Sequence, residues 1–466
     1  MKHLVCLLLF FSVSLAQADD RPNFVVIMVD DMGYAGVSCF GNPSFKTPEI
    51  DRLAAEGMRL TDFHSSGTVC SPTRAGLLTG RYQQRAGIEA VIHPHREHPE
   101  HRKGLQKTEV TFAELLRSAG YATALIGKWH QGYVHNSDDY YPQNHGFDEF
   151  IGYHSGNIDF ISHVGDHNEH DWWHGREETK EEGYVTDLIN QYALEFIERN
   201  QEGPFCLYIP HLAIHNPVQV RGDPVRRTEE GWNRWKPADE AERIEKYRGM
   251  TLPIDEGVGQ IREKLVSLEI DRKTLVLFFS DNGAAAYDFP SGSPNLRGNK
   301  GSVYEGGHKV PFIAWWPGRI APGSESDIPG ITLDIMPTLL SLAGLEPPAD
   351  RPLDGIDLSP VLLKQQRIPE RPLYWASLDN GGNRSEAMRD GPWKLVVQHP
   401  QARKGSFENE QLELYRLDED SSEKTDLAGE EPDRAVTMLN RLKTWYAETQ
   451  KNATPQVGGW LKMGRQ

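Results

Sequence analysis

The stretch Phe24-Val25-Val26-Ile27-Met28-Val29-Asp30-Asp31 indicates the fold class, because six apolar residues lead without a break into two adjacent carboxylates. A continuous β-rich run of this length is typical of a strand buried on both faces of a parallel sheet. Three later apolar runs also end in polar residues: 122–126 before Gly127-Lys128-Trp129-His130, 205–209 before His211 and His215, and 275–279 before Ser280-Asp281-Asn282-Gly283. The carboxyl ends of parallel strands share one edge of a sheet, so the four runs predict one shared site there.

Helical patterns separate these strands. Thr47 and Pro48 suit the start of a helix and Gly57 suits its end. Further helices are expected at 111–119, 184–199 and 247–268. After about Pro347 the pattern changes to short strand candidates at 373–376, 386–390, 393–397 and 413–417, followed by an amphipathic helix at 433–449. The sequence predicts an α/β fold, with a large mixed, mostly parallel sheet flanked by helices in residues 19–346. A small C-terminal α+β domain, an antiparallel sheet plus one helix, is expected in 347–466.

The overall charge argues against several classes of function. The chain has 466 residues with 50 Lys+Arg, 67 Asp+Glu and a formal net charge of −17. A strongly acidic balance argues against a nucleic-acid-binding protein and against electrostatic docking on an anionic membrane. An anionic substrate would therefore need a local basic pocket.

The first 18 residues are expected to be a signal peptide. Lys2 and His3 precede an apolar run at 4–15, and Ala16-Gln17-Ala18 has the small-x-small pattern of a cleavage site. The run is too short for a stable membrane span, and no later stretch reaches about 20 apolar residues. The protein is therefore expected to be exported, to the periplasm or the medium, without stable membrane insertion. Cleavage would leave three cysteines, and Cys39 and Cys206 could be either disulfide-bonded or free.

The sharpest motif is Cys70-Ser71-Pro72-Thr73-Arg74-Ala75-Gly76-Leu77-Leu78-Thr79-Gly80-Arg81. Pro72 suits the first turn of a helix, which puts Cys70 near a helix N-terminus, where the pKa of a thiol is expected to fall. A lone cysteine here would ordinarily be a small buried residue. The whole stretch, however, resembles the modification signature of the type I formylglycine-dependent sulfatases of the alkaline phosphatase superfamily. In that family the cysteine is oxidised to formylglycine (3-oxoalanine), whose hydrate attacks sulfur.

The resemblance covers most of the chain and keeps the family order. Asp30-Asp31, Gly127-Lys128-Trp129-His130, Ser280-Asp281-Asn282-Gly283 and the stretch from Leu296 to Gly307, which holds Lys300, each match a family element. It implies one calcium ion bound by Asp30, Asp31, Asp281, Asn282 and the modified Cys70. Independently of the family, Asp30, Asp31, Asp281 and Asn282 offer only oxygen ligands, which hard cations prefer.

The resemblance also implies roles for the other site residues. Arg74 would hold the hydrated formylglycine, and Lys128 and Lys300 would bind the sulfuryl oxygens and stabilise developing charge. His130 would hydrogen-bond the second hydroxyl and take its proton. His215 is the expected acid for the leaving alcohol, and Asp281 is expected to assist deprotonation of the attacking hydroxyl. His211 lies off the motif, and it is expected either to contact the catalytic residues without touching the substrate or to have a purely structural role.

The sugar-binding residues rest on a weaker pattern. The stretch at 152–159 and Asp171-Trp172-Trp173-His174 mix aromatic and hydroxyl-binding side chains, and the expected contacts are His154, Asn157, Asp159 and Trp172. The tryptophan pair could equally be core aromatics. The segment is similar to one in sulfatases of galactose-type sugars, so sulfated galactose-configured oligosaccharides are the expected substrate. Histidine clusters at 93–101 and 163–174 could suggest zinc, but neither has a recognised ligand spacing, so lining of the substrate cleft is preferred.

Two other functions stay open at this point. One is a phosphonate or phosphodiester hydrolase on the same fold, and the other is a non-catalytic polyanion-binding protein on a sulfatase scaffold. Every expected catalytic position is filled, which counts against the second. The expected partners are a sulfated oligosaccharide or polysaccharide and a formylglycine-generating or anaerobic sulfatase-maturating enzyme. The sequence does not indicate the oligomeric state.

Overall fold

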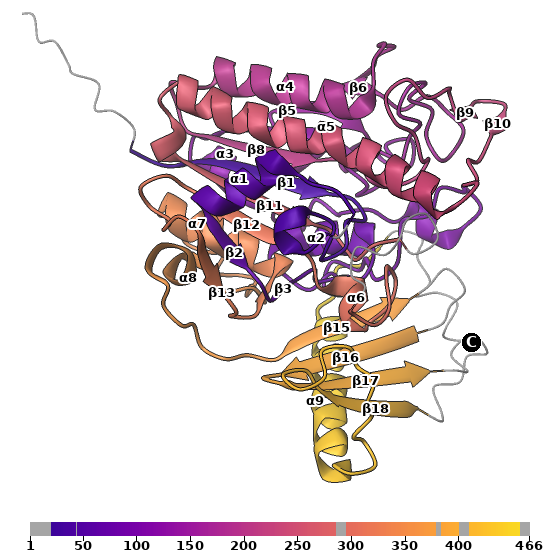
Figure 1. The fold of residues 1–466 in the computed structure, drawn as a ribbon, viewed down its shortest axis with the longest axis vertical. Helices are drawn as coiled ribbons and strands as arrows, with labels where there is room; N and C mark the ends of the chain where they lie inside the picture. The colour runs from indigo at the N-terminus through magenta and orange to yellow at the C-terminus, as the bar shows by residue number, and fades with distance from the viewer. Residues whose placement is uncertain (1–19, 43, 286–294, 379–383, 400–409, 457–466) are drawn as a thin grey trace, which may run out of the picture.

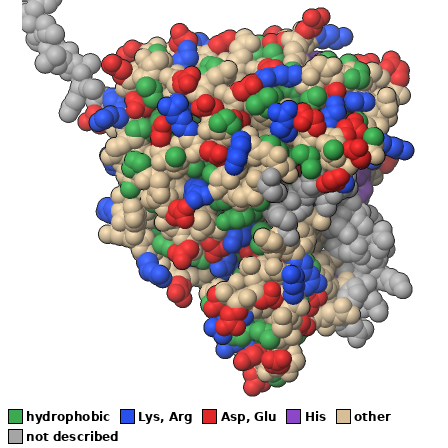
Figure 2. Space-filling view, in the orientation of Figure 1, with side chains coloured by type: hydrophobic (Ala, Val, Ile, Leu, Met, Phe, Trp, Pro, Cys, Tyr) green, Lys and Arg blue, Asp and Glu red, His purple; other side chains and the backbone are tan. Residues whose placement is uncertain are grey.

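The structure is a computed structural model that describes residues 20–42, 44–285, 295–378, 384–399 and 410–456. The expected signal peptide lies outside these residues. Within them, no helix combines the length and the apolar character that crossing a bilayer requires. Figure 2 shows acidic and basic side chains interspersed over the visible face, so the net negative charge is spread rather than gathered in one patch there.

The four apolar runs form neighbouring parallel strands, as predicted. β1 (Asn23–Val29) lies between β11 (Thr274–Ser280) and β8 (Phe205–Pro210), and β4 (Ala122–Lys128) pairs with β8. The full sheet has the order β13-β2-β12-β11-β1-β8-β4-β5-β6-β7. Its remaining strands are β13 (Ser324–Ser326), β2 (Met58–Leu60), β12 (Phe312–Trp315), β5 (Glu149–Tyr153), β6 (Trp173–His174) and β7 (Glu177–Glu178). β12 runs antiparallel to β11 and β6 antiparallel to β5, so the sheet is mixed.

Helices cover both faces of this sheet (Figure 1). Alternate residues of β1 point to opposite faces. Val25, Ile27 and Val29 pack with α1 (Pro48–Glu56), α4 (Val185–Arg199) and α5 (Glu240–Ser267). Phe24, Val26 and Met28 belong to the second core, with α2 (Cys70–Thr79), α3 (Phe112–Ser118), α7 (Ile335–Ala343) and α8 (Ser359–Lys364).

The four predicted helices are present, with one shifted start. α3 begins with a capping box in which Thr111 accepts from the Glu114 amide. α5 begins at Glu240, earlier than the expected 247, because Asp239 caps it by accepting from the amide of Glu242. Short 3-10 turns lie at Ser38–Phe40, Pro99–Arg102, Asp138–Tyr140, Pro142–His145, Asp271–Lys273 and Thr332–Asp334.

The predicted C-terminal sheet is also present, below the main sheet in Figure 1. Its strands are antiparallel in the order β15 (Leu373–Leu378), β16 (Arg384–Asp390), β17 (Trp393–His399) and β18 (Gln411–Arg416), and α9 (Pro432–Lys451) packs on them. Its core also takes in Tyr82, Val303 and Leu333 from earlier in the chain. α8 follows the expected boundary at 346 yet packs in the core of the larger lobe.

Smaller elements connect the two lobes and border the strand ends. β3 (Phe63–His64) pairs with β14 (Gly330–Ile331), and α6 (Glu305–His308) follows the loop that carries Lys300. β9 (Arg227–Thr228) and β10 (Gly231–Trp232) form a separate hairpin.

Candidate functional site

The carboxyl ends of β1 and β11 bring four oxygen-bearing residues together. Val29 and Ser280 are partners in the parallel register, so Asp30 and Asp31 leave the sheet beside Asp281 and Asn282. The Asn282 amide donates to Asp31 Oδ1 at 2.7 Å, and the Asp31 backbone N–H donates to Asp281 Oδ1 at 3.2 Å. All four side chains are buried.

Several of these buried oxygens are left without a donor. No described residue donates a hydrogen bond to Asp30 Oδ1, Asp31 Oδ2 or Asn282 Oδ1. Ligand atoms of Asp30, Asp31 and His215 lie within 4.8 Å of one another. Buried carboxylate oxygens are costly unless they are paired, and a set of oxygen ligands is what calcium prefers. The donor set therefore fits a calcium ion.

Three cations border the three acids. Lys128 Nζ bonds to Asp30, Lys300 Nζ lies 2.6 Å from Asp31 Oδ1, and an Arg74 terminal nitrogen donates to Asp281 Oδ2 at 2.8 Å. Burial alone would raise the pKa of Asp30, but Lys128, His215 and Arg74 outweigh it and hold that pKa well below its ordinary value. The pKa of Asp281 is raised, by burial and then by the charge of Asp30.

Cys70 lies at the head of α2, beside these charges. It is the first residue of the helix and is 3% exposed. Arg74 follows one turn later on the same helix face. The expected fall in the thiol pKa is wrong: burial raises the pKa of Cys70, and the nearby Lys128 and Lys300 do not reverse it.

His130 is oriented by Ser71, the residue after Cys70, and by the backbone of Ile92. Its Nε2 lies 3.1 Å from both Ser71 Oγ and the carbonyl oxygen of Ile92. The Ile92 backbone N–H donates to the same Ser71 hydroxyl at 3.0 Å. With Nε2 donating to the Ile92 carbonyl, Nδ1 carries the lone pair, and no described residue bonds to it. Burial lowers the pKa of His130, so its ring is a neutral acceptor.

His215 approaches the acids from the loop after β8. Its Nδ1 lies 2.8 Å from the carbonyl oxygen of Asn216, and its Nε2 lies 3.6 Å from Asp31 Oδ2. The Nε2 atom is therefore the one that faces the acidic cluster. His211, also after β8, is buried, and burial lowers its pKa to about 3. No described residue bonds to its Nδ1.

The expected sugar-binding residues fall into different environments. Trp172 is fully buried in the core, and its indole donates to Glu181 at 2.7 Å. Asp159 accepts four backbone N–H groups, from Ile161, Ser162, Arg226 and Arg227. Asn157 accepts from the guanidinium of Arg227 at 2.7 Å.

A cavity of 550 Å³ is lined in part by His154, and we call it the neighbour cavity. Its lining also includes Tyr133, Tyr141, Asp171 and Trp173. Sequence reasoning singled out Trp172 rather than Trp173. Adjacent residues of an extended chain face opposite sides, so one of the pair had to face away from the core. This alternation is the sequence signal that could have identified Trp173 as well as Trp172 as a candidate lining residue.

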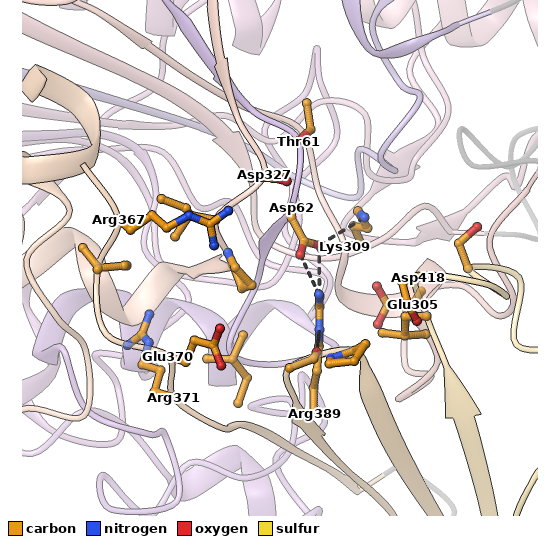
Figure 3. Close-up of a pocket in the computed structure, with 18 of the residues that line it drawn as sticks. Thr61, Asp62, Glu305, Lys309, Asp327, Arg367, Glu370, Arg371, Arg389 and Asp418 are labelled. Atoms are coloured by element: carbon orange, nitrogen blue, oxygen red, sulfur yellow. Dashed lines mark hydrogen bonds and ion pairs between the residues drawn. The ribbon is translucent and has the colours of Figure 1, made fainter. Parts of the chain in front are cut away.

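A larger cavity, of 640 Å³, lies between the two lobes and is lined by none of the residues expected in the site. Figure 3 shows Asp62 at its centre, bound by Arg389 and Lys309. An Arg389 terminal nitrogen donates to Asp62 Oδ2 at 2.7 Å, and Lys309 Nζ lies 3.1 Å from Oδ1. These charges are already paired across the lobes, so they tie the lobes together.

The histidine clusters form no metal group within the described ranges. His93 stacks on His98, with ring centroids 4.1 Å apart, and His101 Nε2 lies 2.8 Å from His135 Nε2. Besides the acidic cluster, the described part of the chain holds one other group with metal-ligating spacing, formed by His64, Glu305 and His308. There the Lys394 ammonium occupies the position that a metal ion would take, 2.8 Å from Glu305 and 3.1 Å from His308.

The cysteine question is settled for the described residues, since Cys39, Cys70 and Cys206 form no disulfide there. Burial and the neighbouring Asp51 raise the pKa of the Cys39 thiol to about 12. Cys206 lies wholly buried in β8.

Comparisons with known proteins identify the family of the chain. The family model described as Sulfatase matches residues 22–345, and one described as N-sulphoglucosamine sulphohydrolase, C-terminal, matches 298–451. The chain is 36% identical to the N-acetylgalactosamine-6-sulfatase of Sus scrofa, covering 80% of this chain and 72% of the relative. It is 33% identical to human arylsulfatase A, covering 79% and 73%.

A solved structure, Ps i-CgsB in complex with k-i-k-neocarrahexaose, superposes with a TM-score of 0.80 at 27% identity. The superposition covers 94% of this chain and 95% of that one. The match to the family model, the relatives and the shared fold lead to one conclusion. The chain belongs to the sulfatase family of the alkaline phosphatase superfamily and is a sulfuric ester hydrolase.

Proposed function

We propose that the chain is an exported sulfatase that removes sulfate from sulfated carbohydrates, with galactose-configured oligosaccharides favoured, using one calcium ion and a formylglycine made from Cys70. The observation that carries the proposal is the cluster of buried oxygens on Asp30, Asp31 and Asn282 that no described residue satisfies, next to the head of α2. Bound there, calcium would supply a Lewis acid for a sulfate oxygen. Formylglycine at position 70 would supply the nucleophilic hydroxyl.

The side chains around the cluster would divide the remaining work. Lys128 and Lys300, which bond to Asp30 and Asp31, would place positive charge on the sulfuryl oxygens as charge develops there. Arg74 is fully buried and holds Asp281 in place. Asp281 would accept the proton of the attacking hydroxyl.

The two histidines would handle the other protons. His130 has its Nδ1 available as an acceptor, so it would take the proton that regenerates the aldehyde. The Nδ1 of His215 donates to the Asn216 carbonyl, so Nε2 is the nitrogen that faces Asp31 and the leaving alcohol. To act as the acid, His215 would have to carry a second proton on Nε2, with the ring protonated on both nitrogens.

The galactose preference draws support from the relatives. The relatives include N-acetylgalactosamine-6-sulfatases, and the neocarrahexaose complex shares the fold. His154 would contact the sugar in the neighbour cavity. Asn157 and Asp159 would act by positioning the loop between β5 and β6, and Trp172 by supporting it from the core. The partners would be the sulfated glycan and the enzyme that converts Cys70.

The test begins with residue 70. The protein is produced with a formylglycine-generating or an anaerobic sulfatase-maturating enzyme, and the tryptic peptide that holds residue 70 is examined by mass spectrometry. Sulfate release is then measured on sulfated galactose, glucosamine and aryl substrates, with aryl phosphate and phosphonate esters in parallel and Cys70→Ala as control. We expect the aldehyde and fast release from galactose-type sugars. Activity limited to phosphorus esters, or full activity of the Cys70→Ala protein, would contradict the proposal.

A further inference from the structure

The neighbour cavity adjoins the catalytic histidine. Tyr133 lines it and follows His130 by three residues, and His154 lines it and precedes Gly156 by two. A Cβ built on Gly156 would lie 3.0 Å from His130 Nε2, so the backbone at 156 packs directly on that ring. The segment 154–156 therefore lines the cavity at His154 and contacts the His130 ring at Gly156.

The inner end of the cavity holds an unpaired polar group. His154 is 2% exposed, and neither ring nitrogen has a hydrogen-bond partner among the described residues. The rings of Tyr141 and Trp173 approach it edge-on, with centroids 5.5 Å and 5.2 Å away. Burial lowers the pKa of His154 to about 4, so its ring is neutral, with one donor and one acceptor nitrogen. Both nitrogens are buried, so the ring forms part of the wall, and the partly exposed aromatic rings of Tyr141 and Trp173 suit the apolar face of a sugar.

The rim of the cavity is acidic. Glu169, Glu178 and Glu229 are exposed there, and Lys180 is the one lysine or arginine among the described lining residues. Glu169 pairs with Arg96 at 2.6 Å, and Glu178 with His170 at 3.0 Å.

The remaining carboxylates add to the negative charge. Glu229 has no ion-pair partner in the described part of the chain. The buried Asp171 accepts the backbone N–H groups of His154 and Ser155 and the indole N–H of Trp173, all neutral donors. Burial alone would lower the pKa of His167, another lining residue, but Asp166 and Asp171 outweigh it and raise that pKa. Even with His167 protonated, the four carboxylates outnumber it and Lys180, so the cavity stays net negative.

The two sites differ in their charged side chains. In the sulfate site three cations, Lys128, Lys300 and Arg74, are each bonded to an acid, whereas the lining of the neighbour cavity has four carboxylates and one lysine. A carboxylate or second sulfate placed in the cavity would meet like charge, and juxtaposed like charges oppose binding. Because the rim is exposed, salt would screen this repulsion.

We infer that the neighbour cavity binds an uncharged sugar unit next to the one that carries the scissile sulfate, and that it selects against a neighbour bearing a carboxylate or a second sulfate. The inference rests on the proposed function and names the substrate class more closely. The substrates would be sulfated galactose-configured oligosaccharides in which the sulfated unit alternates with a neutral one.

The experiment compares three disaccharides that share the same sulfated unit and differ in the neighbour: a neutral hexose, a uronic acid and a sulfated hexose. We expect kcat/KM at low ionic strength to favour the neutral neighbour by about tenfold over either anionic one. That ratio should shrink as salt is added. Trp173→Ala should lower kcat/KM for the neutral disaccharide more than for a small aryl sulfate.

The acidic rim is tested by a double variant, Glu178→Gln with Glu229→Gln. It should narrow the ratio between neutral and anionic neighbours, whereas Glu202→Gln, an exposed glutamate after α4, should leave the ratio as it was. Equal kcat/KM for all three disaccharides at low salt, or a ratio insensitive to the double variant, would overturn the inference.

A binding measurement separates this outcome from a failure of the proposed function. Calorimetry with the Cys70→Ala protein should show tighter binding of the neutral-neighbour disaccharide, whether or not turnover is observed. Loss of turnover on every sulfate ester by the formylglycine-bearing protein would count against the proposed function alone. Equal binding of all three disaccharides would count against the inference alone.

Discussion

Asp31 occupies a tightly constrained position among the acidic residues at the strand ends. Its backbone is left-handed, with φ of 63°, and its Oδ1 is bonded by Lys300 and Asn282. Its Oδ2 has no hydrogen-bond donor among the described residues. The residue therefore has one oxygen committed to the protein and one available for a cation.

We predict that Asp31→Ala abolishes turnover and the response of thermal stability to calcium. A ligand that binds only the folded state stabilises it by about 2.7 kcal/mol at 100 times its Kd. Chelator-stripped protein should therefore melt higher when calcium is restored, and the Asp31→Ala protein should not. Differential scanning fluorimetry measures this, with Asp187→Ala on the surface of α4 as the control. A full calcium response in the Asp31→Ala protein would exclude the site.

Gly156 offers a second test at the scale of one residue. An added Cβ would lie 2.8 Å from Asp166 Oδ2 and 3.0 Å from the His130 ring. We predict that Gly156→Ala displaces His130 and lowers kcat by about 100-fold, because small displacements of catalytic groups are costly. Gly203→Ala, where a Cβ would meet nothing within 4 Å, is the matched control. Unchanged kcat with a normal melting temperature would show that His130 does not need this backbone contact.

Residues at strand ends could be predicted from the sequence, whereas loop residues could not. Asp30 and Asp281 follow buried apolar runs, and the parallel register alone brings them together. Asp159 and Asn157 sit in a loop, where nothing in the local sequence reveals that backbone N–H groups and Arg227 already occupy their oxygens. The thiol pKa of Cys70 was misjudged because a helix N-terminus is visible in a sequence and the extent of burial is not.

At the scale of elements, β15 connects the C-terminal sheet to the loop that carries Lys300. The Ser377 hydroxyl donates to the carbonyl oxygen of Gly301 at 3.0 Å and accepts from the Thr68 hydroxyl at 2.9 Å. The Gly301 backbone N–H donates in turn to the Thr68 carbonyl oxygen at 2.8 Å. Ser377 thus joins the segment before Cys70 to the residue after Lys300.

We predict that Ser377→Ala raises KM for sulfate esters several-fold, because the Lys300 loop loses an anchor. The cost in stability should stay near 1–3 kcal/mol, the range for a buried hydrogen bond left unmade. Steady-state kinetics and urea unfolding measure the two effects. Ser385→Ala on β16 removes a comparable hydroxyl, bonded to Gln398 at 2.6 Å, without touching this loop. Equal kinetic effects of the two substitutions would refute a positioning role for Ser377.

Elements with strong periodicity were predictable, and their ends depended on tertiary contacts. The four apolar runs and the C-terminal strands lie within a few residues of their expected bounds. α5 begins at Glu240 rather than at 247 because Asp239 caps it there, and its buried residues start only at Tyr247. Packing on α1 and α4 stabilises the later turns, which run through Pro253. The short β9–β10 hairpin went unpredicted, since strands of two residues carry no detectable alternation.

At the scale of the whole molecule, the interior holds many histidines kept neutral by burial. Burial lowers the pKa of His145 and His154 to about 4 and that of His211 to about 3, against an ordinary value of 6.5. The unfolded chain would protonate these rings below about pH 6.5, while the folded chain resists until about pH 4. The unfolded state therefore binds more protons in this window, and acid favours unfolding.

We predict that the free energy of unfolding falls as the pH drops from about 6.5 to about 4. Each fully responsive histidine contributes a slope of about 1.4 kcal/mol per pH unit within that window. Urea unfolding at half-unit pH steps measures it. His145→Gln should lower the slope of the free energy of unfolding against pH by about 1.4 kcal/mol per pH unit, because it removes a ring whose pKa is lowered by burial. His95→Gln, at an exposed position, is the control and should preserve the slope. A slope that is the same in the wild type and in the His145→Gln protein would mean that burial of this ring does not couple folding to protonation.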